Sequence, residues 1–271
     1  MADYSVLAHA IEKKNIAELL KSNRRSDGRN KDEFRDLEIT TDVVKTAYGS
    51  SLVKLGKTQI ICGVKAQLST PYADSPDKGS FSVLFETSPL SGPGYRLGPP
   101  QPQAIEIARV TDRVIRESQC LDLEKLCLIE GEKIWQIFID LYSLDDNGNF
   151  FDAAAIAAYS ALLNTKLPDT KIDDEGKIEI LETRTPLELN SFPVSVTTYK
   201  IDDHFLVDAN LKEELIADAR ITFGTTETHI VSGQKGGSAG IKSNDLLEIL
   251  KNSIKIASEL REKITEQLKI D

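Results

Sequence analysis

The sequence predicts an α+β fold that is divided into two sub-domains. Strand-like runs are followed by helical patterns twice along the chain, and the polar, acidic and proline-containing segment 165–177 separates the two series. We expect an N-terminal helix and a basic connector over residues 1–30. The first sub-domain is then expected over 31–165, and the second, with a long C-terminal helix, over 178–271.

The first third of the chain contains one helical pattern and several strand-like runs. Apolar residues recur at a helical spacing near the N terminus, and alternation of apolar with polar residues marks the strands after it. The dipeptide Gly56-Lys57 lies between two such runs and predicts a β-hairpin. The expected elements are helix 4–22, connector 23–31, strand 37–41, hairpin strands 50–55 and 58–64, and strand 81–85.

The middle of the chain begins with a segment that can be neither a helix nor a central strand. Residues 89–103 hold five of the ten prolines and three glycines, so we predict a long loop that is functional or mobile. A clear helical pattern follows over 103–118. Residues 134–144 are nearly continuously apolar, which predicts a strand buried on both faces. An alanine-rich helix is expected over 151–164, packed closely in the same core.

The second half is predicted to contain strands followed by a helix. Strand-like runs lie near 178–182, 193–200, 204–208, 219–223 and 228–232. The glycine-rich run 233–240 does not have the spacing of a phosphate-binding loop, because Ile241 follows its last glycine where a lysine is required. We predict instead a turn between strand and helix. The terminal helix is expected over 243–269, with Ser243 or Asn244 as its N-cap.

The composition is that of an ordinary globular protein. Of the 271 residues, 40% are hydrophobic and 28% are charged, which excludes a disordered or fibrous protein. The longest uninterrupted apolar run, 153–159, is far shorter than the roughly 18 residues of a membrane helix. The N-terminal residues are too charged for a signal peptide, and three cysteines cannot form a full disulfide set. We therefore expect a soluble, cytoplasmic protein.

The formal net charge of −10 disfavours general affinity for nucleic acids, because an acidic protein repels polyanions at long range. Contact with a nucleic acid therefore requires a local basic patch, for example one shared with another chain. Such a patch can be sought among the arginines of the predicted helices.

Histidine and cysteine chemistry is disfavoured by the spacing of these residues. His9, His204 and His229 have no partner at the spacing of a metal site or a catalytic triad. Cys120 and Cys127 lack the second pair of ligands that a structural zinc site needs. Surface or core histidines and buried thiols are the expected interpretation.

Acidic residues gather after an alternating strand in the second half. They are Asp202, Asp203, Asp208, Glu213, Glu214 and Asp218. Carboxylates at a strand end can hold a hard cation such as Mg²⁺. Acidic loops also cap helices and keep surfaces soluble, and the residues alone leave both interpretations open.

Three arginines lie on one face of the predicted helix 103–118. Arg109, Arg113 and Arg116 are spaced at i, i+4 and i+7, which places them within about 60° of one another, opposite the apolar face. The planar donor fork of arginine suits phosphate oxygens. We call these three residues the arginine stripe.

A solvated charged face is the alternative interpretation of the arginine stripe. Charged helical faces are usually solvated, and pairs such as Glu106–Arg109 and Asp112–Arg116 would neutralise this one. The residues alone favour that interpretation. The adjoining proline-rich loop contains Arg96 and no acidic residue, which favours binding.

Several motifs occur together, in order, along nearly the whole chain. They are Arg25 to Arg29 (RSDGR) with Glu33 to Arg35 (EFR), Gly49 to Thr58 (GSSLVKLGKT), Ala104 to Ser118 (AIEIARVTDRVIRES), Leu121 to Leu126 (LDLEKL) and Asp146 to Ala153 (DNGNFFDA). This set resembles the non-catalytic RNase PH-like ring subunit of the archaeal exosome. The resemblance implies an RNase PH fold, with a sub-domain like domain 2 of ribosomal protein S5 and a second α/β sub-domain.

The resemblance also implies a function and partners. The family forms a hexameric ring of three heterodimers with a catalytic paralogue, which shortens RNA from its 3′ end by phosphate attack on the last linkage. We therefore expect a non-catalytic subunit that pairs with the catalytic RNase PH-like subunit and helps to structure its active site. Single-stranded RNA and RNA-binding cap subunits are further expected partners, and no membrane is. Phosphate and magnesium are expected at the partner's site, with no cofactor in this chain.

Carrying over the family's catalytic residues one by one implies catalytic silence. Catalytic members bind phosphate through a loop of backbone and arginine donors, whereas the matching residues 148–152 contain no arginine and add the carboxylate of Asp152. Catalytic members also hold magnesium between two aspartates six residues apart. Asp218 matches the later one, but Lys212 stands six residues before it. Glu213 would enter only if the alignment slipped by one residue. We expect neither catalytic nor metal-binding residues in this chain.

For RNA binding, the resemblance reverses the balance of the two interpretations of the arginine stripe. Arg109 and Arg113 match positions that contact RNA phosphates at the interface with the catalytic partner, and Arg116 and Arg96 are further candidates. One alternative is that the chain is itself an active phosphate-dependent 3′–5′ exoribonuclease. Another is an unrelated α+β protein such as a small-molecule kinase, which needs a glycine-rich nucleotide loop that 233–240 does not supply.

Overall fold

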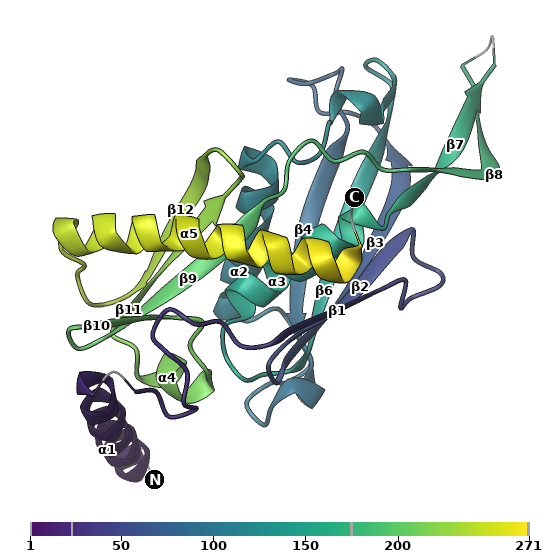
Figure 1. Cartoon of the computed structure of the whole chain (residues 1–271). Coiled ribbons are helices and arrows are strands. Elements are labelled where there is room, and N and C mark those ends of the chain that lie inside the picture. The colour runs from purple at the N-terminus through teal and green to yellow at the C-terminus, as the bar shows by residue number, and fades with distance from the viewer. Residues whose placement is uncertain (1, 23, 174–175, 270–271) are drawn as a thin grey trace.

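Two β-sheets with a buried helix between them form the body of the molecule. In a computed structural model, which describes residues 2–22, 24–173 and 176–269, one sheet contains six strands and the other four. Helix α3 (Phe150–Leu163) packs against strands of both sheets (Figure 1). Every residue from Phe150 to Leu162 is buried, because the run of alanines lets both sheets approach the helix closely. The predicted α+β class is confirmed.

The larger sheet has the strand order β1-β2-β3-β6-β4, with β5 paired to β6. Its strands are β1 (Leu37–Thr41), β2 (Gly49–Leu55), β3 (Thr58–Ser69), β4 (Ser80–Thr87), β5 (Cys127–Ile129) and β6 (Lys133–Asp145). The predicted hairpin is β2–β3, in which Leu55 lies opposite Thr58. Strand β4 runs parallel to β6, and the other pairings are antiparallel.

The prediction that 134–144 is buried on both faces is wrong. In β6 the buried residues Ile137, Ile139 and Leu141 alternate with half-buried neighbours, and Tyr142 is 40% exposed. Helices α2 (Pro102–Glu117) and α3 pack against each other and against this sheet, so they cover one of its faces. The apolar residues Phe138 and Tyr142 therefore lie on the more open face, although their composition suggests burial.

The smaller sheet has the order β10-β9-β11-β12 and is antiparallel throughout. Its strands are β9 (Val194–Ile201), β10 (His204–Val207), β11 (Ala219–Thr225) and β12 (Ile230–Gly237). Strand β12 occupies most of the glycine-rich run, so the predicted turn over 233–240 is wrong. Gly233, Gly236 and Gly237 lie opposite Phe223, Arg220 and Ala219 of β11, so the glycines do not interrupt the ladder.

The long C-terminal helix α5 (Ser243–Leu268) packs across β9, β11 and β1, and so ties the two sheets together (Figure 1). Its N-cap is Lys242, and not Ser243 or Asn244 as predicted. The N-terminal helix α1 (Ala2–Lys21) lies at one end of the molecule against the short helix α4 (Leu211–Ile216), which was not predicted. No helix in the described ranges is long and apolar enough to cross a membrane.

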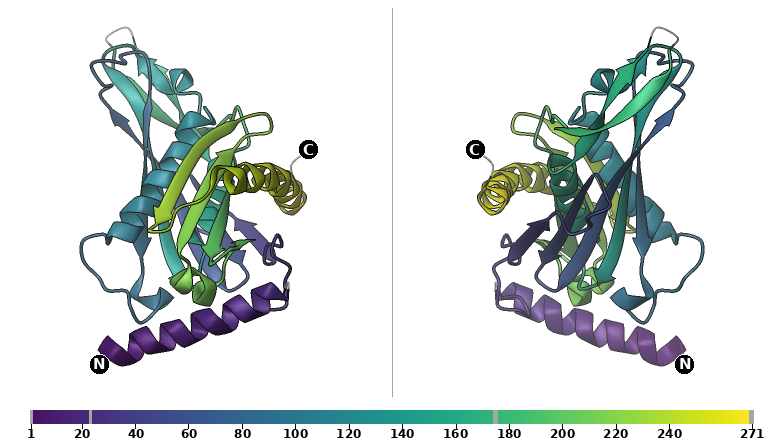
Figure 2. Two further views of the ribbon diagram at one scale, coloured as in Figure 1. Left: turned by 90° about the vertical axis from the view of Figure 1, so that its left-hand side faces the viewer. Right: turned by 90° about the vertical axis from the view of Figure 1, so that its right-hand side faces the viewer.

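The expected polar link 165–177 is mostly a strand. Strand β7 (Lys166–Ile172) pairs with β8 (Ile178–Pro186) in a hairpin that projects from the body (Figures 1 and 2). The strand predicted near 178–182 therefore belongs to this hairpin and not to the smaller sheet. The sequence of β7 looks like a link because most of its residues are polar and only Leu167 and Pro168 are buried. Residues 174 and 175 of the predicted link lie outside the described residues.

The proline-rich loop leads directly into α2. It contains the short 3₁₀ helix η1 (Pro89–Ser91), and a second one, η2 (Glu124–Leu126), follows α2. The hydroxyl group of Tyr95 donates a hydrogen bond of 2.5 Å to Asp146 Oδ2 and fastens the loop to the segment before α3. Helix α2 begins at Pro102. The missing N–H of this proline costs nothing there, because the N–H groups of the first helical turn have no partner within the helix.

Candidate functional site

The arginine stripe lies on the outer side of α2. Arg109 and Arg116 are exposed and Arg113 is half-buried. The predicted apolar face is buried, including Ile107 and Val114. Together with residues 81–83 of β4, the stripe lines a groove of about 410 Å³.

Arg116 is engaged within the chain. Its guanidinium lies 2.8 Å from Asp112 Oδ1, as predicted, and 4.1 Å above the centroid of the Phe81 ring. Its Nη2 also donates to the Phe81 carbonyl oxygen at 3.3 Å. The charge of Arg116 is therefore largely balanced before any ligand arrives.

The positive charges of Arg109 and Arg113 are not balanced by a carboxylate among the described residues. Arg113 Nη1 donates to the neutral amide oxygen of Gln234 at 3.2 Å. Within the described part of the chain, Arg109 has no hydrogen bond or ion pair. The predicted pair Glu106–Arg109 is wrong, because Glu106 Oε2 lies 2.6 Å from Arg220 Nη2 instead.

Arg96 lies in the proline-rich loop before α2 and is exposed. Arg96 precedes Pro102, the first residue of α2, by six positions. The structure gives no contact between Arg96 and the stripe.

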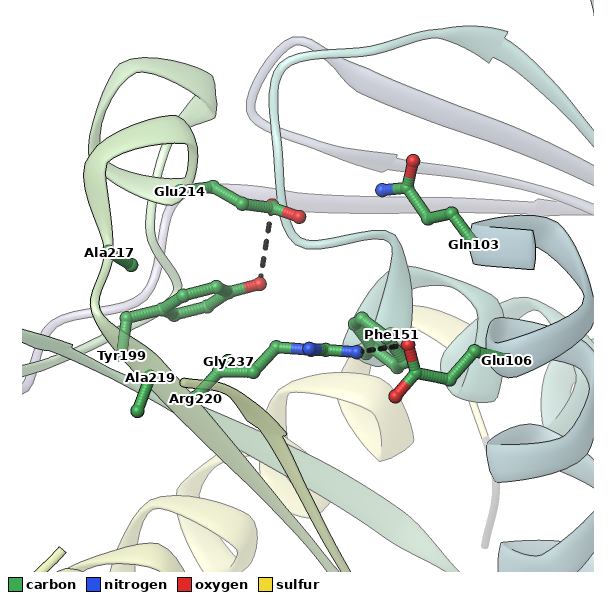
Figure 3. Close-up of a pocket in the computed structure, with 9 residues that line it drawn as sticks. All are labelled: Gln103, Glu106, Phe151, Tyr199, Glu214, Ala217, Ala219, Arg220 and Gly237. Carbon is green, nitrogen blue, oxygen red and sulfur yellow. Dashed lines mark hydrogen bonds and ion pairs between the residues drawn. The ribbon is translucent and has the colours of Figure 1, made fainter. Parts of the chain in front are cut away.

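A second pocket, of about 230 Å³, lies where α2, α3, α4 and the smaller sheet meet (Figure 3). Its lining consists of Gln103, Glu106, Phe151, Tyr199, Glu214, Ala217, Ala219, Arg220 and Gly237. Because the segment 148–152 and the acidic cluster both reach it, this pocket is the place to look for phosphate and metal ligands.

The carboxylate of Glu214 accepts a hydrogen bond from a backbone N–H of the segment 148–152, which matches the phosphate-binding loop of catalytic members in sequence position. The N–H of Asn149 donates to Glu214 Oε2 at 2.7 Å, and the Tyr199 hydroxyl donates to the same oxygen at 3.2 Å (Figure 3). Burial raises the pKa of Glu214. The chain thus places its own acid at the N terminus of α3, where anions are favoured.

An arginine does reach this pocket, although the segment 148–152 supplies none. The guanidinium of Arg220 lies 4.2 Å above the centroid of Phe151 and pairs with Glu106. It can pass beneath β12 because Gly236 has no side chain; a Cβ there would lie 1.8 Å from Arg220 Nη1. The guanidinium of Arg220 and the N–H of Asn149 therefore both already face a carboxylate.

Asp152 does not occupy the pocket, contrary to the expectation that it stands where an anion should sit. Its side chain is fully buried and accepts hydrogen bonds from Thr197 N at 2.9 Å, Thr197 Oγ1 at 2.8 Å and Asn149 Nδ2 at 2.8 Å. Burial raises the pKa of Asp152 to about 7. It joins α3 to β9, and Glu214 is the acid at the loop.

The acidic cluster is dispersed over separate partners. Asp218 Oδ1 lies 2.5 Å from Lys13 Nζ of α1, and Asp218 Oδ2 accepts from the N–H of Asp202 at 2.9 Å. Lys212 projects from α4 with its ammonium group 3.7 Å from Glu12. In the described ranges, no three His, Cys, Asp or Glu side chains are arranged to hold a metal ion.

Two other acids of the cluster are bound by the arginines of the N-terminal motifs. Arg25 Nη2 lies 2.6 Å from Glu213 Oε2, and both side chains are fully buried. Arg35 Nη2 lies 2.7 Å from Asp208 Oδ1, and Arg29 Nη1 lies 2.9 Å from Asp208 Oδ2. The motifs RSDGR and EFR therefore fasten the connector to the smaller sheet, a structural role that spacing alone did not reveal.

The two histidines with described side chains each contact one polar side chain. His204 Nδ1 lies 3.5 Å from Lys31 Nζ, and His229 Nδ1 lies 2.7 Å from the hydroxyl of its neighbour Thr228. The side chain of His9 lies outside the described residues. Cys120 is buried, which raises the pKa of its thiol to about 12.

The sequence of this chain matches two domains of one family. Residues 33–168 match domain 1 of the 3′ exoribonuclease family, and residues 191–256 match domain 2. The chain belongs to the 3′ exoribonuclease family. The expected resemblance and the RNase PH fold are thereby confirmed.

Several proteins that resemble this chain are archaeal. The exosome complex component Rrp42 of Thermococcus kodakarensis is 44% identical over 266 residues, which cover 97% of each chain. A chain of the Archaeoglobus fulgidus exosome with RNA bound to the active site has a TM-score of 0.88 and 41% identity, covering 95% of this chain and 99% of that one. A chain of an archaeal exosome core has a TM-score of 0.84 and 39% identity, covering 96% and 98%.

Proposed function

We propose that this chain is a catalytically silent subunit of an exosome ring that degrades RNA from the 3′ end. It pairs with a catalytic RNase PH-like subunit, helps to structure that subunit's active site and contacts RNA phosphates through α2. Its exosome relatives and its match to both domains of the 3′ exoribonuclease family support the subunit role. The observation that carries catalytic silence is the Glu214 carboxylate on the N–H of Asn149.

Inorganic phosphate would meet two carboxylates at the pocket. Asn149 N–H already serves Glu214, and Arg220 already serves Glu106. A phosphate ion would have to displace two carboxylates or lie beside them, and like charges in a partly buried site repel strongly. The lining of the pocket is therefore unsuited to a phosphate nucleophile.

Magnesium is disfavoured at the position of Asp218 for a similar reason. Mg²⁺ requires oxygen ligands in octahedral geometry, and the nearest charged group to Asp218 is the ammonium of Lys13. The pKa of Asp218 is lowered: its partial burial would raise it, but the hydrogen bonds from Lys13 and from the Asp202 N–H, with the charges of Lys13 and Lys200, together outweigh that effect. We infer that phosphate and magnesium bind in the catalytic partner, and that this chain holds no cofactor.

We assign RNA contact to the arginines of the stripe that have no carboxylate partner in the part of the chain that the structure describes. Arg109 has free donors and Arg113 uses one on a neutral amide, so both can bind phosphate oxygens in the groove beside β4. Arg116 contributes less because Asp112 balances its charge, and Arg96 offers a further contact from the loop. We expect three heterodimers in a hexameric, cytoplasmic ring that also binds RNA-binding cap subunits.

Phosphate-dependent shortening of an end-labelled single-stranded RNA tests the proposal. The purified chain should leave the RNA intact, and its mixture with the catalytic subunit should be more active than the catalytic subunit alone. A matched reaction without phosphate controls for contaminating hydrolytic nucleases. Phosphate-dependent shortening by the chain alone would favour the alternative, an active phosphorolytic exoribonuclease, and overturn catalytic silence.

A further inference from the structure

The glycine-rich strand β12 carries a side chain that links the pocket to the arginine stripe. Gln234 Nε2 donates to Glu106 Oε1 at 3.3 Å, and Gln234 Oε1 accepts from Arg113 Nη1 at 3.2 Å. Strand β12 lies at the edge of the smaller sheet and packs against α2, so Gln234 reaches across from one sub-domain to the other.

The orientation of the Gln234 amide is determined by its two partners. A carboxylate only accepts hydrogen bonds and a guanidinium only donates them, so the amide nitrogen must face Glu106 and the oxygen must face Arg113. The other oxygen of Glu106 is held by Arg220, whose guanidinium lies on the Phe151 ring. A continuous chain of contacts therefore runs from the start of α3 to the groove.

We propose that Gln234 is a positioning residue for Arg113, which it aims at an RNA phosphate in the groove between α2 and β4. This inference rests on the proposed function. A neutral amide restricts the guanidinium while leaving its charge intact, and arginine has five N–H donors, most of which stay free. Arg116 shows the contrast, because its acidic partner Asp112 both restricts and neutralises it.

The test measures RNA binding by the assembled ring with the catalytic subunit, in phosphate-free buffer, using an end-labelled oligoadenylate at several salt concentrations. Gln234→Glu should weaken binding about tenfold, because a carboxylate at this position would pair with Arg113. The slope of log K against log salt should become shallower by about 0.7, the value of one single-strand phosphate contact. Gln234→Ala should weaken binding by only about two- to threefold, since Arg113 then loses its restraint but keeps its charge.

Gln67→Glu on β3 is the charge-matched control, because Gln67 is exposed and lies in the other sheet. It should leave both the affinity and the salt slope unchanged. Ring assembly, followed by size-exclusion chromatography, should be the same for all variants, which separates positioning from a structural role.

The background of Arg113→Ala completes the experiment. If Gln234 acts through Arg113, Gln234→Glu adds no further loss when Arg113 is already alanine. The inference is overturned if Gln234→Glu reduces RNA affinity equally in both backgrounds. It is also overturned if Arg113→Ala makes the salt slope shallower while Gln234→Glu leaves the slope unchanged. If Arg113→Ala itself leaves the slope unchanged, the proposed RNA contact fails, and that outcome is distinguishable from failure of the positioning role alone.

Discussion

The N–H of Asn149 lies 2.7 Å from Oε2 of Glu214, so an acid of α4 serves the backbone donor at the start of α3. The two elements approach closely because Gly148, with φ +86°, has no side chain; a Cβ there would lie 2.6 Å from Leu211 N. An acid of the fold itself thus lies at the N terminus of α3, where an anion is favoured. Removing the acid should therefore affect stability.

Glu214→Ala should lower the free energy of unfolding by about 1–3 kcal/mol, because it leaves the Asn149 N–H and the Tyr199 hydroxyl without their acceptor. Glu214→Gln retains an acceptor oxygen and should cost less. Urea denaturation followed by circular dichroism measures both, with the exposed Glu132→Ala as the control. Equal stability of Glu214→Ala and the wild type would show that the contact contributes nothing to folding.

Lys212→Asp places an aspartate six residues before Asp218, the spacing expected of the magnesium ligands, yet it should not create phosphorolytic activity. Lys13 still pairs with Asp218, and Glu214 and Glu106 still occupy the donors of the pocket. The measurement is phosphate-dependent RNA shortening by the variant alone, with the catalytic subunit as positive control. Detectable shortening would show that our interpretation of residues 148–152 is wrong.

Much of the fold follows from local patterns in the sequence. Helix α2 is predictable because its buried residues recur with helical period, and the β2–β3 hairpin because Gly56-Lys57 separates two alternating runs. Strand β7 is not, since most of its residues are polar and only Leu167 and Pro168 are buried, so its sequence looks like a link. The open face of β6 also escapes prediction, because sequence does not show which face a helix covers.

The site was less predictable than the fold, because its contacts join distant parts of the chain. Asn149 and Glu214 are 65 positions apart, and Arg113 and Gln234 are 121 positions apart. The arginine stripe follows from helical spacing. Spacing does not show that Arg113 bonds the neutral amide of Gln234 while Arg116 pairs with the carboxylate of Asp112. Gly236 offered one signal: a glycine inside a strand often marks the close approach of another group, here Arg220.

The buried carboxylate of Asp208 should make stability depend on pH. Its pKa is lowered: burial alone would raise it, but hydrogen bonds and charge from Arg35, and the charge of Arg29, outweigh that effect. Because the folded pKa lies below the unfolded value of about 3.9, the unfolded chain binds more protons. The stabilisation is therefore present above that pH and is lost as the pH falls through the folded pKa.

Asp208→Asn should lower the free energy of unfolding at pH 7 by about 3–5 kcal/mol, because it leaves the buried Arg35 without a counter-charge and Arg29 with Asp27 alone. It should also flatten the decline of stability below about pH 4. Denaturant unfolding at several pH values measures both effects. Asp203→Asn, at an exposed position, is the matched control. An unchanged pH profile in Asp208→Asn would assign the acid sensitivity to other carboxylates.

Replacing both free arginines of the stripe should weaken RNA binding without dissolving the ring. Arg109→Ala with Arg113→Ala removes two phosphate contacts, so the slope of log K against log salt should become shallower by about 1.4. Arg116→Ala should change the slope less, because Asp112 already balances that charge. Arg184→Ala, on the exposed strand β8, removes one positive charge elsewhere and serves as the control.

The readouts are filter binding of an end-labelled RNA and size-exclusion chromatography of the ring. A slope that stays at the wild-type value in the double variant would mean that the stripe is a solvated face of α2, and that RNA reaches the catalytic partner by another path.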